Sequence, residues 1–161
     1  AVQIAKATGA EVTGVCSTRN VDMVRSIGAD HVIDYTNEDF TNGDVRYDLI
    51  FDNVGAQSLR DMRSVLTPDG LLLANGAAAP RGWFGGLGHP LKVTASSVFN
   101  KQQGSAFLST ENPEDLATLR ELAEAGSITP VIDRVFPLDD AVEAVAFVGD
   151  GHNQGTSVIT M

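Results

Sequence analysis

Short apolar runs alternate, in the first half of the chain, with stretches whose apolar residues recur every three or four positions. Apolar, β-prone runs indicate strands, whereas the longer spacing indicates one face of a helix. The continuous apolar centre of one run, Leu49 to Phe51, predicts a strand covered on both faces. The patterns predict strands at 11–17, 31–35, 47–54 and 71–76, helices over 1–9, 20–28 (capped by Asn20) and 58–66, and a turn over 67–70.

The second half continues this alternation after a glycine-rich stretch that predicts a long loop. Its clearest helix begins at the cap Asn112, with Pro113 in the first helical position. Leu116, Leu119 and Leu122 predict a stripe that faces the core. The predicted segments are a loop over 77–104, a strand at 105–110, a helix over 112–126, an extended segment at 128–138, a helix over 139–151 and a strand at 156–161.

Strands and helices that alternate in this way predict a parallel sheet with helices on both faces, an α/β doubly wound fold of the Rossmann type. The opening letters AVQIAKATGA read as the middle of a helix, so we expect a fragment that lacks the first strand and the Gly-rich loop of the fold. That strand would lie between strands 11–17 and 47–54. We therefore expect this chain alone to fold poorly or to borrow a strand.

The composition narrows the classes of protein. A net charge of −10 argues against nucleic acid as the main partner. No apolar run approaches the roughly 20 residues that a membrane helix needs. Cys16 is the only cysteine, which excludes a disulfide within the chain and a four-cysteine zinc site. We expect no metal site and interpret Cys16 as an inert, buried residue.

Ligands of doubly wound sheets bind outside the carboxyl ends of the strands. The strand at 11–17 ends in Ser17, Thr18 and Arg19, where an acidic residue would hold the adenosine ribose of NADH. Two hydroxyls and a guanidinium can instead donate hydrogen bonds to the 2′-phosphate of NADPH. The sequence therefore predicts NADPH as the cofactor, although a solvated turn explains the same residues equally well.

The other strand ends carry small, aromatic or glycine residues rather than the histidines and carboxylates of a hydrolase. Tyr35 can pack near the adenine or close the sheet edge. Glycine lets backbone approach a flat ring closely, but it is also ordinary after a strand. The remaining candidate cofactor-binding residues at strand ends are Asn53, Val54, Gly55, Gly76 and Ala77.

The chain resembles the C-terminal half of a medium-chain dehydrogenase/reductase, in the zinc-independent, quinone oxidoreductase-like branch. The segments that carry the resemblance are AVQIAKATGAEVTGVCSTRNVDMVRSIGADHVIDY, YDLIFDNVG, LTPDGLLLANG and the closing stretch from Leu122 to Thr160. Within the branch the chain is most similar to reticulon-interacting-type NADPH oxidoreductases, in which the CS and GH motifs recur at these places.

The resemblance implies hydride transfer from NADPH to a carbonyl, an enone or a quinone. It implies an NADP-binding Rossmann domain over 1–126 and a segment over 127–161 that returns to a catalytic domain outside this chain. It also places His152 and Asn153 against the cofactor. Gly155 is not followed by the lysine usual in the family, so no role is carried over for that lysine. We name no catalytic residue and expect this fragment alone to be inactive.

Two alternatives stay open at this point. A non-enzymatic NADPH-binding or interaction protein can use the same scaffold, because a fold does not settle function. An S-adenosylmethionine-dependent methyltransferase usually has an acid where this chain has Ser17, Thr18 and Arg19, so it is the weaker alternative. We expect a small-molecule substrate, no nucleic-acid or membrane partner, and a homodimer as an option. The expected location is cytoplasmic, with the mitochondrion as the alternative.

Overall fold

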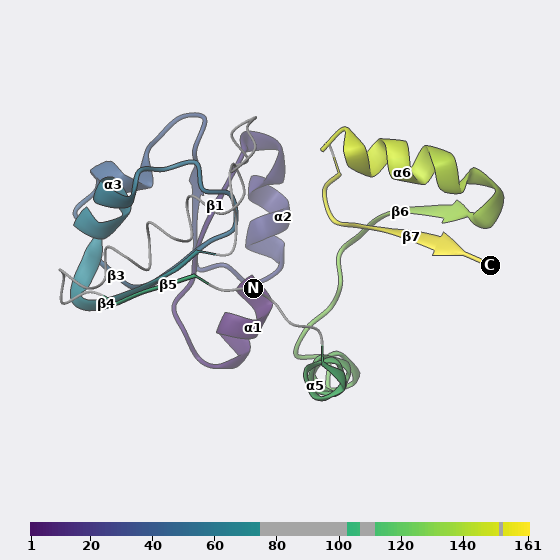
Figure 1. The fold of residues 1–161 in the computed structure, drawn as a ribbon, viewed down its shortest axis with the longest axis horizontal. Coiled ribbons are helices and arrows are strands. Elements are labelled where there is room, and N and C mark those ends of the chain that lie inside the picture. The colour runs from purple at the N-terminus through teal and green to yellow at the C-terminus, as the bar shows by residue number, and fades with distance from the viewer. Residues whose placement is uncertain (75–102, 107–111, 152) are drawn as a thin grey trace. The chain divides into compact units, whose positions relative to one another are not determined.

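The computed structural model describes residues 1–74, 103–106, 112–151 and 153–161. The chain divides into two compact units: unit 1 comprises Ala1–Asp39 and Asn112–Met161, and unit 2 comprises Phe40–Glu111. Short 3₁₀ turns lie at η1 (Thr18–Asn20), η2 (Phe40–Asn42) and η3 (Leu138–Asp140). The helices and strands, labelled in Figure 1, are α1 (Val2–Ala7), β1 (Thr13–Cys16), α2 (Val21–Ser26), β2 (His31–Asp34), β3 (Tyr47–Asp52), α3 (Leu59–Ser64), β4 (Leu66–Ala74), β5 (Gln103–Ala106), α5 (Pro113–Glu124), β6 (Ile132–Pro137), α6 (Ala141–Gly149) and β7 (Thr156–Thr160).

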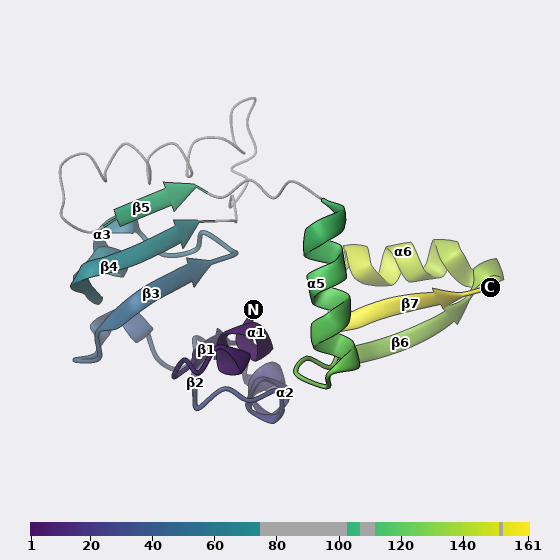
Figure 2. The ribbon, with the colours of Figure 1, turned by 90° about the horizontal axis from the view of Figure 1, so that it is seen from below.

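Every strand pairing among the described residues is parallel, which confirms the predicted class of fold. In unit 1, β1 pairs with β2 and β6 pairs with β7. In unit 2, β4 lies between β3 and β5, and the three strands run side by side in Figure 2. β1 and β3 belong to separate sheets, and no described strand pairs with both of them. The strand that the sequence predicts between them is therefore not among the described strands.

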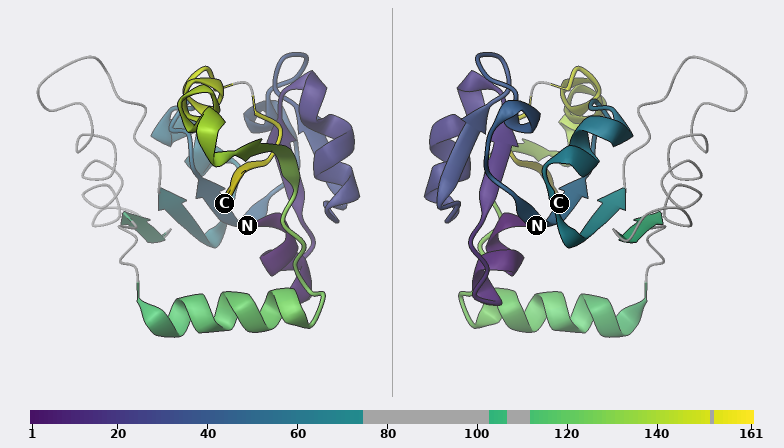
Figure 3. Two further views of the ribbon diagram at one scale, coloured as in Figure 1. Left: turned by 90° about the vertical axis from the view of Figure 1, so that its right-hand side faces the viewer. Right: turned by 90° about the vertical axis from the view of Figure 1, so that its left-hand side faces the viewer.

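The core of the N-terminal part of unit 1 lies between α2 and the β1–β2 pair. Val24 of α2 and Ala29 are buried with Cys16 of β1. Gly14 makes this close packing possible, because a Cβ at this position would collide with Cγ1 of Val24. Figure 3 shows α2 alongside β1. The packing fixes the direction in which the chain leaves β1 and enters α2.

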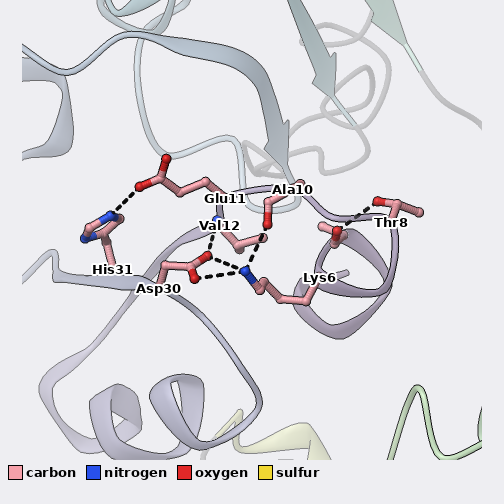
Figure 4. Close-up of polar contacts among 8 residues, drawn as sticks. Lys6, Thr8, Ala10, Glu11, Val12, Asp30 and His31 are labelled. Carbon is pink, nitrogen blue, oxygen red and sulfur yellow. Dashed lines mark hydrogen bonds and ion pairs between the residues drawn. The ribbon is translucent and has the colours of Figure 1, made fainter.

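An ion pair ties α1 to the start of β1 and β2 (Figure 4). Nζ of Lys6 lies 2.8 Å from Oδ2 of Asp30, and it also donates a hydrogen bond to the carbonyl of Ala10 at 3.0 Å. The same carboxylate accepts a hydrogen bond from the backbone N–H of Val12 at 2.7 Å. The hydrogen bond from Lys6, followed by that from Val12, lowers the pKa of Asp30. Nearby, His31 lies 2.8 Å from Glu11 at the surface.

Among the described residues of unit 2, the buried core lies on one face of the sheet. Met62 of α3 packs with Leu72 of β4, and both side chains are fully buried. Ile50 of β3 packs against this cluster, whereas its neighbours Leu49 and Phe51 are 51% and 39% exposed. The prediction that 49–51 is covered on both faces is therefore wrong for this chain. Successive side chains of a strand point to opposite faces, and α3 covers one of them.

The predicted turn over 67–70 was wrong, because these residues lie within β4 (Leu66–Ala74). The pairing nevertheless breaks there: Tyr47 pairs with Leu66, and the next matched pair is Leu49 with Leu71. The residues between Leu66 and Leu71 thus form a bulge in an otherwise parallel ladder. The turn-forming residues act as an irregularity of the strand rather than as its boundary.

In the C-terminal part of unit 1, α6 packs on the β6–β7 pair, as Figure 1 shows. Phe136 and Ala144 are buried there. The guanidinium carbon of Arg134 lies 4.2 Å from the ring centroid of Phe147, within reach of a cation–π interaction. The predicted helix and final strand are confirmed, and the predicted extended segment at 128–138 contains the strand β6.

Both predicted helix caps lie at the expected positions, but only one of them caps through its side chain. Oδ1 of Asn112 accepts a hydrogen bond from the backbone N–H of Asp115 at 2.8 Å, as a cap should. Asn20 precedes α2 without a side-chain capping bond. The predicted core stripe of α5 is not buried: Leu116 and Leu119 are 62% and 41% exposed, and Leu122 is half-buried.

The glycine-rich loop predicted over 77–104 lies, up to residue 102, outside the described residues. The strand predicted at 105–110 is found earlier, as β5 (Gln103–Ala106), and 107–111 also lie outside the described residues.

Candidate functional site

The turn that follows β1 brings three of the predicted cofactor-binding residues together. We call residues 17–20 the β1–α2 turn. Ser17 is extended, and its carbonyl accepts a hydrogen bond from the backbone N–H of Asn20 at 2.8 Å. The 3₁₀ turn η1 then runs directly into α2 at Val21. The chain reverses within these four residues, and α2 then packs closely against β1 at Gly14, where a Cβ would collide with Cγ1 of Val24.

Thr18 anchors this turn to the end of β2. Its hydroxyl donates to Oδ2 of Asp34 at 2.6 Å and lies 2.9 Å from the hydroxyl of Thr36. The Thr36 hydroxyl and backbone N–H also donate to Asp34, as does the side chain of Asn37 at 2.7 Å. The hydrogen bond from Thr18 is the largest cause of a lowered pKa of Asp34.

A hydroxyl has one hydrogen to donate, and Thr18 donates its hydrogen to Asp34. A phosphate oxygen accepts hydrogen bonds and donates none, so Thr18 would have to release Asp34 before it could contact a phosphate. Its predicted role at a 2′-phosphate stays a prediction. In this structure its contact fixes the position of the turn.

Ser17 and Arg19 keep donor capacity. Oγ of Ser17 accepts a long hydrogen bond of 3.4 Å from Nδ2 of Asn20, and its own hydrogen can still be donated. Arg19 is exposed, and Nη2 donates to the carbonyl of Gly151 at 3.2 Å. A guanidinium has five N–H donors, so one such contact leaves most of them for an anion.

We call residues 150, 151 and 153–155, which lie between α6 and β7, the α6–β7 loop. This loop contacts the β1–α2 turn although the two segments are far apart in the sequence. Nε2 of Gln154 donates to the carbonyl of Arg19 at 2.6 Å and to Oδ1 of Asn20 at 3.1 Å. Gln154 was not predicted from the sequence, because a glutamine in a polar loop carries no local signal of so distant a partner. Asn153 donates instead to the carbonyl of Gly155 at 2.8 Å, and its predicted cofactor role stays a prediction. His152 lies outside the described residues.

Tyr35 continues from the end of β2. Its backbone N–H donates to the carbonyl of Cys16 at 3.0 Å, which extends the β1–β2 pairing by one bond. Its side chain is 61% exposed and does not close the sheet edge by burial.

Burial, followed by the charge of Asp34, raises the pKa of the Cys16 thiol, which agrees with the interpretation of Cys16 as inert.

The end of β3, in unit 2, forms a compact turn around Asp52. One carboxylate oxygen of Asp52 accepts hydrogen bonds from the backbone N–H groups of Val54 and Gly55, at 3.0 and 2.8 Å. Gly55 has a φ of 71°, a conformation that favours glycine. Asn53, Val54 and Gly55 thus lie together at the carboxyl end of β3, as predicted from the sequence. Their contact with a cofactor stays a prediction, and Gly76 and Ala77 lie outside the described residues.

Neither a cluster of metal ligands nor a helix able to cross a membrane is found among the described residues. No group of three or more histidine, cysteine, aspartate or glutamate side chains lies close enough together, in that part of the chain, to hold a metal ion. None of the described helices combines the length and the apolar character that crossing a bilayer requires. Zinc independence itself stays a prediction.

Residues 27–159 match the zinc-binding dehydrogenase family, and the chain belongs to this family. The mouse protein named NAD(P)H oxidoreductase RTN4IP1, mitochondrial, is 33% identical to it, over 100% of this chain and 44% of that protein. The tomato 2-methylene-furan-3-one reductase is 28% identical, over 98% of this chain and 36% of that protein. The chain therefore spans less than half the length of these relatives.

The structural comparison agrees. The quinone oxidoreductase from Coxiella burnetii superposes with a TM-score of 0.78 and 25% identity, over 99% of this chain and 48% of that protein. Together with the parallel strand pairings, this confirms the Rossmann-type fold and the resemblance to quinone oxidoreductases of the medium-chain dehydrogenase/reductase type.

Proposed function

We propose that this chain is the cofactor-binding half of an NADPH-dependent oxidoreductase. The observation that carries the proposal is the β1–α2 turn, which presents the Ser17 hydroxyl and the exposed Arg19 guanidinium at the carboxyl end of a parallel strand. Ligands of such sheets bind at this edge. The names of the relatives, which include NAD(P)H oxidoreductases, support the same cofactor.

Asp34 lies beside the β1–α2 turn and could oppose the binding of NADPH there. A free carboxylate near this turn would favour the ribose hydroxyls of NADH and repel a 2′-phosphate. The two oxygens of Asp34 already accept hydrogen bonds from Thr18, Thr36 and Asn37. These four hydrogen bonds fill the roughly four acceptor positions of the carboxylate and stabilise its negative charge. The donors of Ser17 and Arg19 therefore fit a phosphate, and Asp34 acts as the anchor of the turn.

The reaction that we propose is the reduction of a carbonyl, an enone or a quinone. Bound NADPH would supply the hydride. The described residues of this chain would bind and orient the cofactor. Ser17 and Arg19 would hold its 2′-phosphate, and Asn53 to Gly55 would line the cofactor. Relatives named for furanone, alkenal and trans-enoyl reduction support an activated double bond as the substrate class.

We also propose the division into an NADP-binding part over 1–126 and a segment over 127–161 that packs on a separate catalytic domain. Exposed apolar side chains of that segment support this division: Val142 and Val145 on α6 are 85% and 70% exposed. An apolar face of this kind is usually covered in the working protein. A homodimer, zinc independence and a cytoplasmic location are further parts of the proposal, although several relatives are named as mitochondrial.

Calorimetric titration of NADPH and NADH into the full-length protein that contains this chain tests the proposal. We expect NADPH to bind about 10- to 100-fold more tightly, since charge-assisted hydrogen bonds contribute about 1.5–3 kcal/mol. Arg19→Asp should abolish this preference. Arg25→Asp is the matched control, because Arg25 is an exposed arginine of the same unit that pairs only weakly with Asp22. Equal binding of both cofactors by the unaltered protein would contradict the proposal.

A turnover assay separates the enzyme from the non-enzymatic alternative. Consumption of NADPH is followed at 340 nm with a panel of enones, alkenals and quinones, using the same full-length protein. Turnover of any of these supports the reductase. Tight NADPH binding without turnover of any member of the panel would favour a binding or interaction protein on the same scaffold.

A further inference from the structure

The α6–β7 loop contacts the β1–α2 turn through three hydrogen bonds that join residues more than 130 positions apart. Two of them come from a single side chain, that of Gln154. The third runs in the opposite direction, from Nη2 of Arg19 to the carbonyl of Gly151. All of these residues lie within unit 1. The end of the chain therefore holds the turn that we propose to bind the 2′-phosphate.

Gln154 is suited to hold a turn in one conformation. A side-chain amide has two N–H donors, and the nitrogen of Gln154 has two acceptors, the carbonyl of Arg19 at 2.6 Å and Oδ1 of Asn20 at 3.1 Å. The backbone of Gln154 is itself fixed, because its N–H donates to Oδ2 of Asp133 in β6 at 2.8 Å. The amide thus has a rigid base and two contacts on consecutive residues of the turn.

Each contact restrains a group that belongs to, or is carried by a residue hydrogen-bonded to, a proposed phosphate ligand. Fixing the carbonyl of Arg19 fixes the peptide plane from which its side chain leaves the turn. Fixing Oδ1 of Asn20 directs the other side of that amide, Nδ2, toward Oγ of Ser17 at 3.4 Å. Ser17 then accepts from Asn20 and points its own hydrogen elsewhere. Gln154 therefore acts on both proposed phosphate ligands without touching the phosphate.

We propose that Gln154 is a positioning residue for the recognition of the 2′-phosphate, acting through Arg19 and Asn20. This inference rests on the proposed function. It goes beyond it by assigning cofactor selectivity to a residue of the C-terminal segment, so that the segment over 127–161 takes part in the choice between NADPH and NADH. The preorganised turn would lose less conformational freedom when it binds the phosphate.

The test uses Gln154→Met in the full-length protein, a change that keeps the length of the side chain and removes both donors. The probes are adenosine 2′,5′-bisphosphate and AMP, which differ only in the 2′-phosphate, titrated by calorimetry. We expect the bisphosphate to bind about three- to tenfold more weakly, the value of one or two neutral hydrogen bonds. Binding of AMP should change by less than about twofold.

Gln3→Met is the matched control. Gln3 also joins the two sequence segments of unit 1, since its side chain exchanges hydrogen bonds with the backbone of Thr129 at 3.0 and 2.7 Å, but it does not contact the turn. A merely structural effect of breaking such a bridge would appear in both variants. Only Gln154→Met should weaken the bisphosphate selectively.

The possible outcomes separate the two proposals. If the unaltered protein does not prefer the bisphosphate to AMP, both the NADPH assignment and the role of Gln154 fail. If it does, and Arg19→Asp removes the preference while Gln154→Met keeps it, only the role of Gln154 fails. The role also fails if Gln154→Met weakens both probes equally, or if Gln3→Met causes the same selective loss.

Discussion

Replacement of Gly14 by alanine should destabilise the part of the protein that presents the β1–α2 turn. A Cβ at this position would collide with Cγ1 of Val24 and would lie 3.6 Å from Cβ of Ala29. Both neighbours are buried, so neither can move into solvent to make room. The added methyl group must push α2 away from β1, and the turn leads directly into α2 at Val21.

Two effects of opposite sign determine the size of the change. Overpacking of a tight core costs about 1–3 kcal/mol. The loss of glycine makes the unfolded chain less flexible, which returns about 0.4–1 kcal/mol. We therefore expect Gly14→Ala to lower the local free energy of unfolding by about 1–2 kcal/mol. Gly43→Ala is the matched control, because an added Cβ there would meet one atom, the backbone nitrogen of Val45, at 3.9 Å.

Hydrogen exchange measured by mass spectrometry on the full-length protein is the suitable assay, because it reports local opening even when the whole protein does not unfold in two states. The amides of β1 and α2 should exchange about 5- to 30-fold faster in Gly14→Ala. The double variant with Val24→Ala should show less damage than the sum of the single variants, since the new methyl group occupies the space that Val24 vacates. Additivity within about 0.5 kcal/mol would refute this account of the packing.

Two further predictions concern charge and core. Asp30 has a lowered pKa in the folded state, so its bonds with Lys6 and Val12 add stability above pH ~4, and this stability is lost as the pH falls through the folded pKa. When the free energy of unfolding is measured as the pH is lowered, Asp30→Asn should therefore lose less stability below pH ~4 than the unaltered protein. Identical curves for the two proteins would contradict this prediction. Leu72→Ala, at a fully buried position, should cost about 2–5 kcal/mol in urea unfolding, and a loss below about 1 kcal/mol would show that the core of unit 2 is elsewhere.

The sequence predicted most of the elements, since the signals that create them are local. Apolar spacing placed α2 and α6, and the cap Asn112 placed the start of α5. Coverage was predicted less well: Leu116 and Leu119 read as a core stripe but are exposed, because a pattern shows which face is apolar and not what lies against it. The turn over 67–70 failed for a related reason, since pairing with β3 holds those residues within β4.

By itself, then, the sequence determined the parallel α/β class and the chemical groups at the strand ends, because both follow from the order and type of neighbouring residues. Tertiary structure alone decided what those groups contact. In the folded chain the Thr18 hydroxyl donates to Asp34, Ser17 and Arg19 keep N–H or O–H donors for a ligand, and Gln154 contacts the β1–α2 turn. The hydrogen bond of Thr18 spans 16 positions of the sequence, and that of Gln154 to Arg19 spans 135. Such contacts depend on how the chain folds back on itself, so a local sequence pattern does not predict them.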